Sequence, residues 1–197
     1  MGAGSTRAAM VRKVVDRTAI FVDAGYLFAS GSKLVVGEKL TRSQLHLDHD
    51  AVLAFLVDVA SQLSGLPLLR SYWYDGASVG PSPAHVALAY HPELKLRLGS
   101  VNEGQQRNVD ELIAGDLTSL AAHRAIADAV LLSGDEDLLP AVERAQELGV
   151  RVHLLGIAPS RENQAASLAQ AADLRRELTQ AEVMRFLSRR RTATDGR

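Results

Sequence analysis

Two short apolar runs, each followed directly by a polar turn, constrain the fold of this chain most strongly. They are Ala19–Val22 and Ala129–Leu132. Continuous runs of this length, without alternation of polar and apolar residues, are typical of strands buried on both faces. Segments with helical spacing lie between them, such as residues 48–63, where Asp48 or Asp50 is a candidate N-cap and Gly65 a stop. This alternation predicts a three-layer α/β/α fold with a mainly parallel central sheet.

The remaining elements are expected from spacing and from turn residues. Further strands are predicted at residues 66–75, 94–101 and 150–155, and further helices at 84–90, 108–122, 136–148, 162–172 and 179–190. Residues 26–47 contain Gly31, Ser32 and Gly37 among mixed charges, which favours a long loop.

Length and composition set the class of protein. A chain of 197 residues favours one domain with extensions, here a domain at 17–175, a flexible segment at 1–16, and a C-terminal helix and basic tail at 176–197. No apolar run approaches the ~20 residues that span a bilayer, and residues 1–12 lack a signal-peptide core. We therefore expect a cytoplasmic protein without a membrane partner. The absence of cysteine excludes disulfides and thiolate metal sites.

The overall charge is almost balanced. Lys and Arg number 22 against 23 Asp and Glu, which gives a net charge of −1. This composition is unlike that of a basic nucleic-acid coat protein, and it argues against tight binding by charge alone. It does not exclude a nucleic-acid substrate.

Aspartates stand where the two apolar runs end. Asp23 closes the first run, and Asp135 and Asp137 follow the second in the sequence Ser133-Gly134-Asp135-Glu136-Asp137. Asp110 falls in the first turn of the helix before the second run. Ligands of parallel sheets bind beyond the carboxyl ends of the strands, so these carboxylates are expected to converge if the two strands are neighbours.

Converging carboxylates repel one another unless a cation neutralises them. Ligands that are all oxygen suit Mg²⁺ or Mn²⁺, and the lack of a His or Cys set disfavours zinc. Such ions can activate water and hold a phosphodiester during displacement. Gly134 would permit a sharp turn and close approach of a phosphate, and Ser133 would donate a hydrogen bond to an aspartate or a phosphate.

Each aspartate also has a structural interpretation. Asp110 and Asp137 could simply cap helices, and Asp23 could be a turn residue. Asp116 lies six residues beyond Asp110, roughly 240° round a helix, so the two cannot share one face. Asp116 either borders the site or makes a structural polar contact. The combination, rather than any single aspartate, favours a metal site.

At these residues the sequence resembles the NYN domain family, a branch of the PIN-like nucleases. The matching segments lie in the family's order within Arg17–Ile157: Ile20–Gly25, Asn108–Leu117, Asp128–Leu138 and Gly149–Gly156. The Ser-Gly-Asp-x-Asp element is fairly specific in this context. Two departures are visible, because many members have Asn shortly after the first Asp, where Gly25-Tyr26 stands here, and Lys-Gly where this chain has Arg107-Asn108.

The resemblance implies a PIN-like fold, a divalent-metal site and an RNA substrate, single-stranded or structured. Carried onto this chain, Asp23, Asp110, Asp135 and Asp137 would be catalytic, metal-binding acids, with Asp116 a further, less certain metal ligand. Ser133 and Gly134 are expected to contact the substrate. Arg107 is expected to contact a phosphate, and Tyr26 is expected to stack on a base. The function expected is that of a metal-dependent endoribonuclease.

Two other functions stay open on the sequence. One is an RNA-binding NYN module that does not cut. The other is a Toprim-like phosphodiester-processing domain, although that class leads with Glu where this chain has Asp23. The choice of RNA over DNA, one metal ion or two, and a homodimer are also left open.

Overall fold

A seven-stranded sheet forms the centre of the computed structural model, which describes residues 16–77, 80–102 and 105–190, with the backbone alone at 101–102 and 105–107. Its strand order is β5-β4-β3-β1-β6-β7-β8. All neighbours are parallel except β5, which pairs antiparallel with β4. The strands are β1 Thr18–Asp23, β3 Leu68–Ala77, β4 Leu94–Asn102, β5 Gln105–Arg107, β6 Asp128–Leu132, β7 Arg151–Ile157 and β8 Leu174–Leu178.

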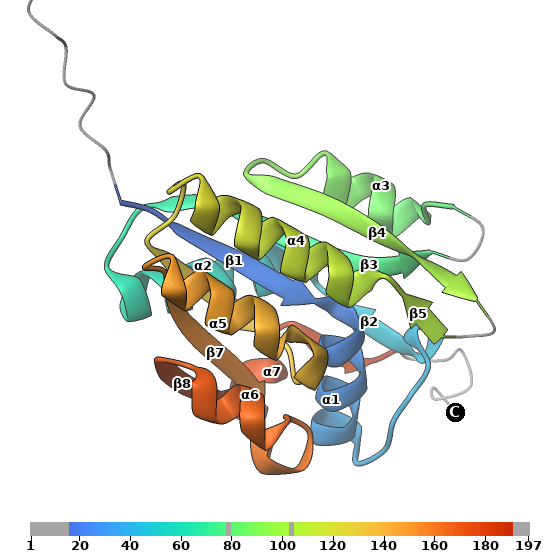
Figure 1. Cartoon of the computed structure of the whole chain (residues 1–197). Helices are drawn as coiled ribbons and strands as arrows, with labels where there is room; N and C mark the ends of the chain where they lie inside the picture. The colour runs from blue at the N-terminus through green and yellow to red at the C-terminus, as the bar shows by residue number, and fades with distance from the viewer. Residues whose placement is uncertain (1–15, 78–79, 103–104, 191–197) are drawn as a thin grey trace, which may run out of the picture.

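Helices cover both faces of this sheet, so the three-layer α/β fold is confirmed. In Figure 1, α4 and α5 cross the near face, and α2 lies behind the sheet. The helices are α1 Ala24–Val36, α2 His49–Ser64, α3 Pro83–Ala89, α4 Val109–Ala122, α5 Leu139–Glu147, α6 Ala166–Ala171 and α7 Gln180–Val183. Short 3₁₀ turns, η1 Arg42–Gln44, η2 Glu136–Leu138 and η3 Ser160–Glu162, join some of them.

Alternation along the central strands divides the core into two. In β1, Ile20 and Val22 pack with α1 and α2, whereas Ala19 and Phe21 pack with α4 and α5. All four side chains are fully buried. Burial on both faces explains why β1 is a continuous apolar run, since each successive side chain enters one core or the other.

Two expectations about secondary structure were wrong, and one strand was not predicted. Residues 24–36 form α1 rather than a loop, because Asp23 caps the helix and tertiary packing outweighs its glycines. Residues 179–190 form α7 and the short strand β9 (Leu187–Arg189) rather than one helix. Residues 174–178, which carried no strand signal, form the exposed edge strand β8.

The strand β9 ties the C-terminal part of the described chain to the region after α1. It pairs antiparallel with β2 (Leu45–Leu47) in a separate two-stranded sheet. Leu187 packs so closely on α1 that a Cβ added at Gly31 would lie 2.6 Å from its Cδ2 atom. Gly31 therefore serves close packing of β9 against the helix.

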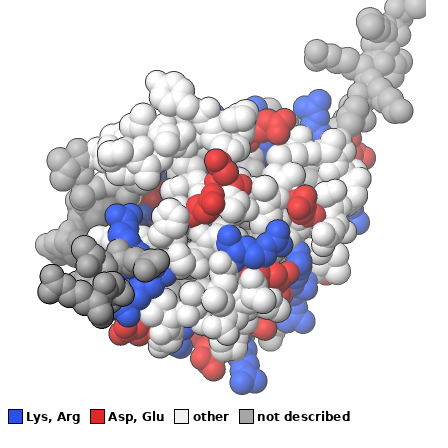
Figure 2. All heavy atoms as spheres, turned by 180° about the vertical axis from the view of Figure 1, so that it is seen from behind, with Lys and Arg blue, Asp and Glu red and all other residues white. Residues whose placement is uncertain are grey.

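Charge is scattered over the face behind the sheet. Figure 2 shows separate groups of basic and acidic residues among large uncharged areas, so the described residues form no continuous basic surface on this face. Within the same part of the chain, no helix combines the length and apolar character needed to cross a membrane.

Candidate active site

The site lies where β1 and β6, adjacent strands of the sheet, end. Val22 is paired with Leu132, so the residues that follow, Asp23 and Ser133, leave the sheet side by side. The Ser133 hydroxyl, which is fully buried, donates a hydrogen bond of 3.0 Å to Asp23 Oδ2. Parallel pairing thus joins two segments that are 110 residues apart in sequence.

Asp23 is both the last residue of β1 and the N-cap of α1. Its Oδ1 atom accepts a hydrogen bond of 3.0 Å from the Tyr26 backbone N–H. The side chain is almost completely buried, and this burial raises the pKa of the carboxyl group despite the hydrogen bonds from Tyr26 and Ser133, which lower it. Asp23 is therefore held in one orientation by both of its oxygens.

Asp110 lies in the first turn of α4 and is half-buried. Burial is the main cause that raises the pKa of its carboxyl group from 3.8 to about 6, and the charges of Asp135, Asp23 and Asp137 raise it further. A carboxylate perturbed by several others marks a concentration of negative charge.

Asp135 and Asp137 are exposed on the turn after β6. Asp135 is the N-cap of η2, and its Oδ1 atom accepts a hydrogen bond of 3.0 Å from the Asp137 backbone N–H. The caps are therefore Asp135 for η2 and Asn108 for α4, rather than Asp137 and Asp110. The cap of η2 uses the Oδ1 atom of Asp135 and leaves its Oδ2 atom for another ligand, so capping and metal binding do not exclude each other.

A pocket of about 470 Å³ collects these groups. We call it the carboxylate pocket, and the residues used below are Asp23, Tyr26, Asp110, Gly134, Asp135 and Asn163. Asp137 lines a neighbouring hollow together with Asp110. The structure thus brings three of the four predicted acids to one pocket and places the fourth beside it.

Tyr26 and Asn163 form a fixed wall of this pocket. The Tyr26 hydroxyl donates to Asn163 Oδ1 at 2.5 Å and accepts from the Ile157 backbone N–H at 3.0 Å. Burial raises the pKa of Tyr26 to about 12, so this hydroxyl stays protonated as the hydrogen bond requires. Base stacking by the Tyr26 ring stays a prediction, and the hydroxyl is engaged in the fold.

Gly134 packs closely against Tyr26 and Asn163. A Cβ atom at this position would overlap the Asn163 carbonyl oxygen and would lie 2.7 Å from Tyr26 Cε2. A side chain there would force the Ser133–Asp135 turn away from Tyr26. Glycine is therefore required by packing, in addition to any approach of a phosphate.

Asp116 does not join the other aspartates. It forms a bidentate ion pair with Arg97, at 2.8 Å to Nε and 2.6 Å to Nη2, and it accepts a hydrogen bond of 3.0 Å from the Tyr74 hydroxyl. Its charge is thus neutralised by β4 and β3. Of the two interpretations of Asp116, the arrangement supports the structural polar contact.

A second carboxylate network lies at the opposite, amino edge of the sheet. Asp128, the fully buried first residue of β6, accepts two hydrogen bonds of 2.9 Å from Arg151 and one contact of 2.7 Å with His153 Nε2. Asp128 is already paired with Arg151, and it lies at the end of the sheet opposite the carboxylate pocket. We therefore interpret this group as a structural network rather than as part of the pocket.

The carboxylates do not form a closed metal cage. Within the described residues, no three His, Asp or Glu side chains are placed to hold one ion. The donors at the carboxylate pocket are nonetheless all oxygens, with charges that repel one another at Asp110. Mg²⁺ is commonly held by one or two carboxylates, with water and phosphate as its other ligands, so this donor set fits such an ion.

The pocket and the predictions differ at two residues, Arg107 and Asn163. The Arg107 side chain lies outside the described residues, so its predicted contact with phosphate stays a prediction. Asn163 was not anticipated, because its segment was taken for a helix. The signal available in sequence was its place in the loop that follows β7, at the same edge as Asp23.

Comparisons with known proteins agree on the family and the fold. A family model described as NYN domain matches residues 17–178. The uncharacterised protein y4oD of Sinorhizobium fredii is 51% identical over 110 residues, which are 55% of this chain and 51% of that relative. The crystal structure of a protein of unknown function from Vibrio parahaemolyticus shares the fold at a TM-score of 0.60 and 19% identity, covering 91% of this chain and all of that one.

Proposed function

We propose, from the premise that the chain belongs to the NYN domain family, that it is a metal-dependent endoribonuclease that hydrolyses RNA phosphodiester bonds at the carboxylate pocket. NYN domains are generally nuclease-like, and the family match covers the whole sheet from β1 to β8. A Toprim-like domain, which the sequence left open, belongs to a different family from the one matched.

The observation that carries the proposal is the electrostatics of Asp110. Its pKa is raised to about 6 by burial and then by three other aspartates. A fold without a use for this arrangement gains nothing from placing Asp23, Asp110 and Asp135 around one pocket, because their repulsion costs free energy at neutral pH. A bound cation would offset this free energy of repulsion.

Mg²⁺ or Mn²⁺, held by Asp23, Asp110, Asp135 and Asp137, would supply an activated water and neutralise charge on the phosphodiester. The contribution of the protein's own residues is to hold the carboxylates in position. Asp23 cannot turn freely, since Oδ1 is held by the Tyr26 N–H and Oδ2 by the Ser133 hydroxyl. Ser133 is thus a positioning residue for Asp23 in this proposal.

The turn Ser133–Asp135 controls how closely a phosphate can approach. Gly134 presents no side chain, and Tyr26 and Asn163 hold the turn from behind. The exposed Asp135 carboxylate faces the solvent side, where an RNA strand would arrive. The ring of Tyr26 lines the same pocket and offers a surface for a base.

The test is cleavage of end-labelled single-stranded RNA and DNA with Mg²⁺, Mn²⁺ or EDTA. Asp135→Asn keeps the cap acceptor and removes the charge, and we expect it to lower the rate by about 100-fold, equivalent to about 3 kcal/mol of lost transition-state stabilisation. Asp58→Asn, an equally exposed aspartate on α2, is the matched control and should cut at the wild-type rate.

Three results would decide the matter. Cutting of RNA that needs the metal and is lost only in Asp135→Asn supports the proposal. Equal cutting by Asp135→Asn and wild type refutes this site. RNA binding by both proteins without cutting under any condition would instead indicate the non-catalytic NYN module.

A further inference from the structure

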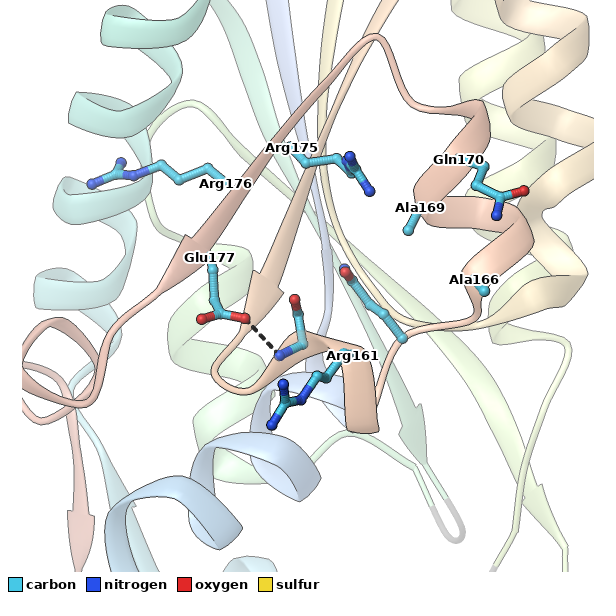
Figure 3. Close-up of a pocket in the computed structure, with 9 residues that line it drawn as sticks. Arg161, Ala166, Ala169, Gln170, Arg175, Arg176 and Glu177 are labelled. Atoms are coloured by element: carbon cyan, nitrogen blue, oxygen red, sulfur yellow. Dashed lines mark hydrogen bonds between the residues drawn. The ribbon is translucent and has the colours of Figure 1, made fainter.

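A second pocket adjoins the carboxylate pocket and bears arginines instead of aspartates. It has a volume of about 500 Å³ and lies between β8, η3 and α6. We call it the arginine pocket, and the residues that matter here are Arg161, Gln164, Ala166, Ala169, Arg175 and Glu177. Figure 3 shows it in close-up.

The two pockets share a wall. Asn163 lines the carboxylate pocket, and the next residue, Gln164, lines the arginine pocket. Gln164 is fixed, since its Nε2 atom donates to the Ser133 carbonyl at 2.7 Å and to the Leu155 carbonyl at 2.9 Å. Two consecutive residues of one loop therefore line the two pockets, so an RNA strand that crosses this loop would meet both.

The arginines differ in what they can bind. Arg175 points toward α6 and Ala169 in Figure 3, whereas Arg176 points to the other side of β8. The Arg176 guanidinium is engaged there, at 2.7 Å from Glu182 and above the Phe55 ring. The exposed guanidinium of Arg175 makes no ion pair or hydrogen bond with the described residues, so it is available to an anion.

One acid opposes these arginines. Glu177 accepts a hydrogen bond of 2.7 Å from the Ser160 backbone N–H, and this bond lowers the pKa of its carboxyl group. Glu177 therefore holds the start of η3 and offsets one positive charge. Together, Arg161, Arg175 and Glu177 leave the pocket with a net positive charge beside a strongly negative one.

We propose that the arginine pocket binds the nucleotide adjacent to the scissile phosphate of the RNA strand, with Arg175 on its phosphate and Ala166 and Ala169 against its base or sugar. Arg161, which Figure 3 shows on the opposite side of the pocket from Arg175, adds positive charge at longer range. This inference rests on the proposed function. Guanidinium groups match phosphate geometry, and a volume of this size admits one nucleotide. A nearly neutral protein would in this way bind RNA by local charge.

The test is equilibrium binding of a fluorescein-labelled single-stranded RNA 12-mer, by anisotropy, in EDTA so that no cutting occurs. We expect the double variant Arg161→Ala/Arg175→Ala to bind at least about 10-fold more weakly, and the slope of log K against log salt to fall by about 0.7 per lost phosphate contact. Ala166→Trp, which fills the pocket from an exposed position, should weaken binding similarly. Glu177→Gln keeps the acceptor for Ser160 and should tighten binding a few-fold.

Arg144→Ala is the matched control, because Arg144 is exposed on α5 and, among the described residues, forms its ion pair with Glu147. It should bind RNA within about two-fold of wild type, and thermal melting checks that every variant is folded. Equal binding by wild type, the double variant and Ala166→Trp overturns the subsite while leaving the proposed function intact. No detectable RNA binding by the wild type also overturns the subsite, whereas the proposed function is judged by the cleavage assay alone. Weaker binding by the double variant, together with an unchanged cutting rate in Asp135→Asn, would show RNA binding at the arginine pocket but overturn its place beside the scissile phosphate.

Discussion

Replacing Asp110 with asparagine should stabilise the metal-free protein at neutral pH. The folded protein binds a proton at Asp110 more tightly than the unfolded chain does, because the pKa rises from 3.8 to about 6 on folding. Stability therefore falls as pH rises between these two values, and the whole penalty is present above pH 6. Asparagine has nearly the same shape and carries no charge, so it removes the penalty.

The size of the expected stabilisation follows from the pKa shift of Asp110. A shift of roughly two units corresponds to about 3 kcal/mol, but Asp110 is half-exposed, and solvent screening reduces the expected gain to about 1 kcal/mol. For a domain of this size that is about 2–4 °C in Tm. The assay is urea unfolding in EDTA at pH 7.5 and pH 5.0, with a smaller gain expected at pH 5.0.

Asp116→Asn is the control within the same helix. It breaks the bidentate pair with Arg97, so we expect it to destabilise the protein by about 1–2 kcal/mol at pH 7.5. Added Mg²⁺ or Mn²⁺ should raise the Tm of wild type and of Asp116→Asn but not that of Asp110→Asn. The reasoning is refuted if Asp110→Asn is less stable than wild type in EDTA at pH 7.5, or if its gain is equal at both pH values.

Three further substitutions test other contacts. Gly134→Ala should lower stability by about 2 kcal/mol and slow RNA cleavage, because its methyl group would overlap the Asn163 carbonyl and the Tyr26 ring; a wild-type melting curve would contradict this. Tyr26→Phe leaves the Ile157 N–H without its acceptor and should cost about 1–2 kcal/mol in urea unfolding while RNA binding is retained; weaker RNA binding at unchanged stability would speak against a structural hydroxyl. Asp128→Asn should cost about 3 kcal/mol by removing the counter-charge of Arg151 and the carboxylate partner of His153, with metal binding measured by calorimetry unchanged; altered metal affinity would show that the amino-edge network reaches the pocket.

The central strands and the acids beyond them could be predicted from sequence because one physical cause produces both signals. Burial on two faces makes β1 and β6 continuous apolar runs, and the first residues outside the sheet are where polar side chains become tolerable. The cap at Asp48 and the stop at Gly65, with φ of 67°, were confirmed for the same local reason.

Other elements depend on partners that are distant in sequence. Helix α1 contains Gly31 because Leu187 packs against it, and a local propensity rule counts that glycine only as a helix breaker. The edge strand β8 is mostly polar, since within the described part of the chain β7 alone pairs with it. Asn163 gains its place in the carboxylate pocket from a hydrogen bond to a tyrosine 137 residues away.

The loop at Asn163 and Gln164 also has a consequence for how this protein can change over evolution. Asn163 holds Tyr26, Gln164 holds the Ser133 carbonyl, and the two residues are neighbours in the chain. A substitution that moves this loop displaces residues of the carboxylate pocket and of the arginine pocket at once, so its effect depends on what occupies both pockets. For the nuclease proposed above, substitutions that affect substrate preference and cutting rate would thereby be epistatic. A lineage that alters its RNA target is then expected to do so at Arg175 or Ala166, outside the loop, before it alters residues 163 and 164.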